Sequence, residues 1–271
     1  MDILTKVAGT DFYFIPFATL IHQPTIKEIA LLGERTLFDA LAIFAGSSPD
    51  YFKKQVLKGI PEEERGATEV ELNYTITSEL DVFYKYCLGT QEKRVIESFL
   101  FLIFESLRGV KFIPIGETKM LLQLSFIDIL SKEENKINTI TLDAENFSEL
   151  KETVSDMFTY QSEEDQEAKL NPAGEMAQKI ADKMAAAAER RAKIYGKNKA
   201  KKDEESVIGT MASILATSDG IPITEVLKLT FPQVLIQLNR TQMFQQYRTQ
   251  ITLGAFGGLE ADDVVNWQQS V

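Results

Sequence analysis

The sequence predicts an α+β fold, with an N-terminal α+β domain of a few short strands and a smaller all-α C-terminal domain. Apolar residues recur at helical spacing in the first and last thirds of the chain, whereas short alternating runs occupy the middle. A reversal of charge marks a boundary between the two parts. We therefore place the α+β domain at 1–160, an acidic linker at 161–170 and the helical domain at 171–271.

The N-terminal range opens with a strand-like stretch at 12–17, and the first long helix is expected to begin at a capping box. Thr25 precedes Glu28 by three residues, a spacing at which each side chain accepts from the other residue's backbone N–H. Apolar residues at helical spacing continue to an expected helix end near Gly46. The range 51–74 is mixed, and Gly59, Pro61 and Gly66 mark loops around an acidic cluster at 62–64.

The middle of the chain predicts the core helix and the strands. Helices are expected at 78–87 and 91–107, and the second is apolar over most of its circumference, as in a central core helix. A further helix is expected at 146–160. The predicted strands are 110–115, 120–126 and 136–142, the first two joined by a hairpin turn.

The reversal of charge lies between the two predicted domains. Residues 143–167 contain nine acidic residues and one lysine, whereas 179–202 contain nine basic and two acidic residues. The polar stretch between these regions is the predicted linker. Beyond it, Asn171 and Pro172 fit an N-cap and a first helical residue. Helices are expected at 172–195, 204–217, 221–229, 231–253 and 259–269, the fourth opening on a second capping box.

Composition argues against several classes of chemistry. The net charge is −11, which disfavours general binding to phosphate backbones. The single histidine, His22, and single cysteine, Cys87, leave no zinc site built mainly from imidazoles and thiolates. We interpret His22 as a helix-boundary residue without an orienting acid, and Cys87 as a structural thiol. We therefore predict a protein without enzymatic activity, cofactor or metal site.

Sequence features also point to a compartment. The longest unbroken apolar run, 99–104, is far shorter than the ~20 residues of a membrane helix. The N-terminus lacks the basic-then-apolar order of a secretory signal. We expect a protein of the cytoplasm with no membrane partner.

Two helices are candidates for partner binding. The basic helix at 179–202 could contact nucleic acid, but it contains one aromatic residue, and a solvated face or an acidic protein partner is the competing interpretation. The helix at 231–253 carries an apolar stripe wider than one narrow face, which indicates burial on two sides or contact with another chain. The predicted partner-binding residues are Arg240, Met243, Phe244, Tyr247, Ile251 and Trp267, with domain core as the alternative.

Three stretches in this order carry a resemblance to a known family. The first is 23–29 (QPTIKEI) followed by Gly33-Glu34, and the second is 171–175 (NPAGE) followed by a basic helix. The third is 227–233 (LKLTFPQ), with an Arg-Thr-Gln-Met stretch at 240–243 and a final tryptophan. Together they resemble the tail assembly chaperones of long-tailed bacteriophages of low-GC Gram-positive hosts.

The resemblance implies a role before the virion is complete. Such chaperones bind the helical tape measure protein and assist polymerisation of tail-tube protein around it, in the host cytoplasm. It implies these two proteins as partners, with self-association as a further option. The alternatives are a structural component of the tail or virion, another adaptor, or a nucleic-acid-binding regulator acting through 179–202.

Overall fold

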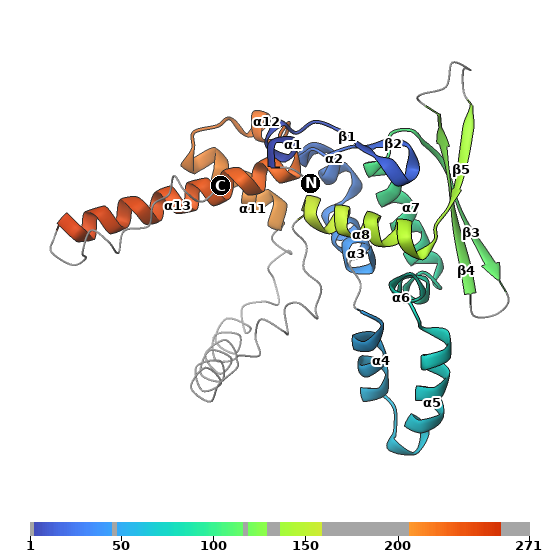
Figure 1. Cartoon of the computed structure of the whole chain (residues 1–271). Helices are drawn as coiled ribbons and strands as arrows, with labels where there is room; N and C mark the ends of the chain where they lie inside the picture. Colours follow the sequence, from blue (N-terminus) through green and yellow to red (C-terminus); the bar gives the residue numbers. More distant parts are fainter. Residues whose placement is uncertain (1–2, 45–47, 116–118, 129–135, 159–205, 256–271) are drawn as a thin grey trace.

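The structure, a computed structural model, describes residues 3–44, 48–115, 119–128, 136–158 and 206–255 (Figure 1). It confirms the α+β fold class, with two small antiparallel sheets packed beside the helices and a helical C-terminal part. The predicted linker, the basic helix and the final helix at 259–269 lie outside the described residues.

The strand predicted at 12–17 is shorter in the structure, because only 12–14 forms a strand and 15–17 forms the turn of a hairpin. Helix α1 (Ile3–Ala8) leads into strand β1 (Phe12–Phe14). A single 3₁₀ turn, η1 (Ile15–Phe17), reverses the chain, and strand β2 (Thr19–Ile21) pairs antiparallel with β1. Proline at the second position of the turn favours this reversal over a continued strand.

The helix predicted from the first capping box is two helices. The capping box of Thr25 and Glu28 is present and opens α2 (Ile26–Leu32). Gly33 ends α2 because its φ of 95° lies where residues with a side chain are strained. A new helix, α3 (Glu34–Phe44), begins immediately after it.

The loop predicted at Gly59 and Pro61 separates two helices, α4 (Pro49–Lys58) and α5 (Glu62–Thr75), which form a helical hairpin. The loop predicted at Gly66 was wrong, because this residue lies inside α5. The Ser48 hydroxyl caps α4, while Gly59 and Pro61 lie in the turn between the helices. Figure 1 shows the hairpin extending away from the other labelled elements. Neither helix contains a buried residue.

The central elements follow the prediction closely. Ser78 and Asp81 form a capping box at the start of α6 (Glu79–Tyr86). Phe44 of α3 is enclosed by rings of α6, α7 (Thr90–Ile103) and α8 (Ala144–Phe158), with centroids 5.2–6.2 Å away. The central helix ends at Ile103, earlier than expected, because Leu107 already belongs to a strand. The strands β3 (Leu107–Ile115), β4 (Lys119–Ile127) and β5 (Ile137–Thr141) form an antiparallel sheet in the order β3-β4-β5.

Three C-terminal helices pack on the N-terminal range. They are α11 (Val207–Ser218), α12 (Ile223–Val226) and α13 (Phe231–Ala255). The Phe231 N–H donates to the Pro24 carbonyl over 2.9 Å, and its ring lies 5.4 Å from that of Phe158. The Glu34 carboxylate accepts from the Val207 N–H at the start of α11, where a negative charge is favourable. The described helices on both sides of the predicted linker thus share one continuous hydrophobic core.

The length and apolar character of the helices can be compared with what a membrane-spanning helix needs. Within the ranges given above, none combines the length and apolar character that a membrane crossing requires.

Candidate functional site

Helix α13 is anchored at its start and extends beyond the core at its far end. Phe231 and Val234 are buried, and Thr241 is the last residue of α13 that the structure describes as buried. The Thr241 hydroxyl and the Gln237 amide both donate to the Asp219 carboxylate at the end of α11. Figure 1 shows the remaining turns running outward from the other labelled elements.

The predicted contact residues follow this outer part of α13. Arg240 and Phe244 are exposed, Phe244 to 43 %, whereas Met243 and Tyr247 are half-buried. A helix turns by about 100° per residue, so these side chains lie on one side of α13. The guanidinium of Arg248 lies 5.9 Å from the Phe244 ring centroid, a cation–π distance.

The other two predicted contact residues are described incompletely or lie outside the description. Ile251 belongs to α13, four residues after Tyr247, but only its place in the helix is described. Trp267 lies outside the described residues.

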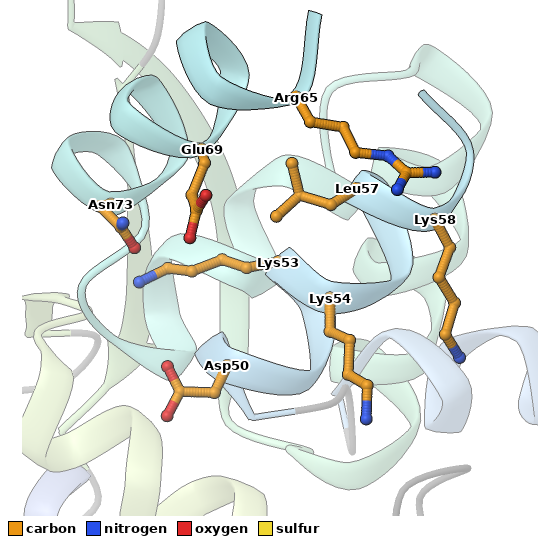
Figure 2. Close-up of a pocket in the computed structure, with 8 residues that line it drawn as sticks. All are labelled: Asp50, Lys53, Lys54, Leu57, Lys58, Arg65, Glu69 and Asn73. Atoms are coloured by element: carbon orange, nitrogen blue, oxygen red, sulfur yellow. The ribbon is translucent and has the colours of Figure 1, made fainter. Parts of the chain in front are cut away.

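A second candidate is a cavity of about 540 Å³ between α4 and α5. In Figure 2, Lys53 points toward Glu69 and Asn73 of α5, while Lys58 and Arg65 lie at the opposite end. Four cationic and two acidic side chains line it, so it can accept a small anionic group on an otherwise acidic protein. The lining residues are Asp50, Lys53, Lys54, Leu57, Lys58, Arg65, Glu69 and Asn73.

A third candidate is the environment of His22, which sequence reasoning missed. The imidazole Nδ1 lies 2.9 Å from an Asp11 carboxylate oxygen and 3.9 Å from one of Glu105. The Nε2 atom lies 3.1 Å from a carboxylate oxygen of Glu28. The expectation that no acid orients His22 was therefore wrong, because three carboxylates surround its ring.

The electrostatics of this cluster follow from its geometry. Burial lowers the pKa of His22, but hydrogen bonds to Glu28 and Asp11 outweigh it, so the net pKa is raised. Burial raises the pKa of Glu28, yet hydrogen bonds from Thr25 and His22 lower it overall. The cluster thus favours a charged imidazole and an ionised Glu28.

One sequence signal did point to part of this cluster. The capping box places Glu28 next to the residues that precede α2, where His22 lies. The contact with Asp11 depends on the register of β1 and β2, and the contact with Glu105 depends on how α7 packs, which the sequence pattern does not specify.

Cys87 is a buried thiol, as predicted. Its exposed fraction is 0 %, and burial raises its pKa to about 12. A thiol held protonated in this way is a poor nucleophile.

Comparison with known protein families, curated proteins and solved structures found no match to this chain.

Proposed function

We propose that this protein is a non-catalytic tail assembly chaperone that binds an extended helical partner, the tape measure protein, along the outer part of α13. The observation that carries the proposal is a 25-residue helix whose first turns lie in the core and whose later turns extend beyond it. Such a helix offers a surface on which an amphipathic partner helix can pack.

The residues of this surface are of the type that anchors protein interfaces. Aromatic and arginine side chains contribute most to binding energy in such contacts. Arg240, Phe244 and Arg248 are exposed, and Met243 lies beside them with an adaptable thioether side chain. We name the tape measure protein as the partner because the ordered motifs of this chain resemble those of tail assembly chaperones.

The two residues best suited to nucleophilic or acid–base catalysis are unsuited to it here. Cys87 is buried with a raised pKa. The hydrogen-bond partners described for the His22 ring nitrogens are carboxylates and not a hydroxyl or thiol that the imidazole could activate. These observations favour a binding role over an enzymatic one.

The test is co-expression of the full chain with a tape measure fragment, followed by measurement of the soluble complex and its affinity. We expect the fragment to remain soluble with the wild-type chain. The double variant Phe244→Ala/Tyr247→Ala should bind at least about tenfold more weakly, as expected when interface anchors are removed.

The matched control is Gln245→Ala, an exposed residue on the opposite side of α13, which should bind as the wild type does. An insoluble fragment, or equal binding by the double variant, would count against this surface. Mass spectrometry of purified virions separates the alternative, because stoichiometric presence would favour a structural tail component.

A further inference from the structure

A junction of three chain segments fixes the carboxylates around His22. In the β1–β2 register, Phe12 pairs with Ile21, which places Asp11 opposite His22 at the open end of the hairpin. The His22 N–H donates to the Ile103 carbonyl at the end of α7 over 2.8 Å. This hydrogen bond brings His22 to the connection between α7 and β3, where Glu105 lies.

A second contact holds the same junction together. The hydroxyls of Thr19, on β2, and Ser106, next to Glu105, lie 2.5 Å apart. Backbone pairing and side-chain hydrogen bonds thus fix the main chain at this junction.

The ligand atoms of this trio are grouped closely enough for one ion. The His22 Nδ1 and one carboxylate oxygen each of Asp11 and Glu105 lie within 4.8 Å of one another. Ligands about 2.0–2.2 Å from a zinc ion lie roughly 3–4 Å apart, so modest side-chain movement completes the set.

The remaining nitrogen of the imidazole has the partner that a metal-bound histidine requires. Metal-ligating histidines usually donate their other ring N–H to a carboxylate, which fixes the tautomer and the ring orientation. The Nε2 of His22 lies 3.1 Å from Glu28, and that same Glu28 oxygen accepts from the Thr25 N–H and hydroxyl, each over 2.8 Å. The second carboxylate partner is therefore itself held in place.

The charges of the cluster also leave room for a cation. Three carboxylates lie within 3.9 Å of the ring nitrogens. A metal ion bound at Nδ1 would displace the proton from that nitrogen, which leaves a neutral imidazole among three negative charges. A divalent ion would balance two of these three charges.

We infer that Asp11, His22 and Glu105 form a binding site for one divalent transition-metal ion, with Glu28 orienting the imidazole. One imidazole nitrogen with two carboxylate oxygens suits zinc or manganese better than magnesium or calcium, which are typically bound by oxygen ligands alone. The ion would tie the N-terminal hairpin to the α7–β3 connection. This inference is independent of the proposed chaperone function.

The test is calorimetric titration of the full metal-free chain with Zn²⁺, with Mg²⁺ as the hard-ion comparison. We expect one Zn²⁺ per chain and much weaker binding of Mg²⁺. His22→Gln should abolish the stoichiometric site, and Asp11→Asn should weaken it at least about tenfold. Glu28→Gln retains a residue that can complete the capping box, and it should weaken binding by about 10- to 100-fold.

The chain has a single histidine, so the ring nitrogens can be observed without ambiguity. In ¹⁵N-histidine-labelled protein, Zn²⁺ should shift the Nδ1 resonance of His22 more than the Nε2 resonance. The control is Glu149→Gln, an exposed carboxylate on α8, which should leave the affinity unchanged. Zinc binding that persists in His22→Gln, or an unmoved Nδ1 resonance, would assign the metal to surface carboxylates and overturn the inference.

Discussion

Replacing Phe231 with alanine tests whether the C-terminal helices and the N-terminal range unfold as one unit. Phe231 is 3 % exposed, and its ring lies 5.4 Å from that of Phe158, across the long segment that joins the two parts. Its backbone N–H donates to the Pro24 carbonyl, and alanine retains that donor. The substitution therefore removes the ring and leaves the backbone contact intact.

The expected loss follows from the burial of this ring. Phenylalanine-to-alanine changes in a core cost about 3–5 kcal/mol, because the transfer free energy of the ring and a residual cavity add together. Roughly 0.5–1.5 kcal/mol of this belongs to the aromatic pair itself. A domain is typically stable by about 5–15 kcal/mol, so the variant should remain folded but much less stable.

Equilibrium unfolding in urea, followed by far-UV circular dichroism, measures the loss. The transition should remain single, with a lower midpoint and an unchanged slope, because the surface exposed on unfolding is the same. The control Phe244→Ala removes a ring that is 43 % exposed and should change the free energy of unfolding by less than about 1 kcal/mol.

Two results would refute this reasoning. One is a loss below about 1 kcal/mol for Phe231→Ala, which would mean that the ring is not enclosed. The other is a pair of transitions of which only one shifts, which would mean that the two parts unfold separately.

Three further predictions concern stability and reactivity. The Cys87 thiol, fully buried with a pKa raised to about 12, should resist a disulfide reagent in the native chain and react completely in urea. Burial raises the pKa of Asp81, but four hydrogen bonds from the residues preceding α6 lower it overall. Because the folded-state pKa is depressed, this stabilisation is present above the unfolded-state value near 4 and disappears as the pH falls through the folded-state value. Urea unfolding should therefore show Asp81→Ala to be about 1–2 kcal/mol less stable at neutral pH, with a smaller difference below about pH 4; a pH-independent difference would contradict this account. Gly9→Ala should lower the free energy of unfolding by about 1–3 kcal/mol, because φ is +63° and the new Cβ would lie 2.6 Å from the Gln233 amide nitrogen; an unchanged thermal midpoint would contradict it.

Local signals in the sequence predicted helix starts and strands correctly where the contacts that form them join residues close in the chain. The capping boxes at Thr25 and Thr230 form as predicted, because their partners lie three residues away. The three central strands and the helix after them also match, since alternation and helical spacing are properties of the segment itself. Prediction failed at two glycines. Helical spacing continues past Gly33, which nevertheless ends α2, and Gly66 predicts a loop but lies inside α5.

The α13 surface shows which part of a candidate site the sequence could predict and which part depended on packing. The grouping of Arg240, Phe244 and Tyr247 on the proposed contact face could be predicted from spacing alone, because these residues share one side of any helix they occupy. How far the core reaches along α13 was decided by packing, through the contact between Thr241 and Asp219.

By itself the sequence determined the fold class, the capped helix starts, the central strands and the scarcity of catalytic side chains, because each depends on composition or on residues a few positions apart. Tertiary structure alone decided that the C-terminal helices complete the N-terminal core and that Asp11 and Glu105 meet His22. Those contacts join positions remote in the chain, and their register and packing are set by the whole core.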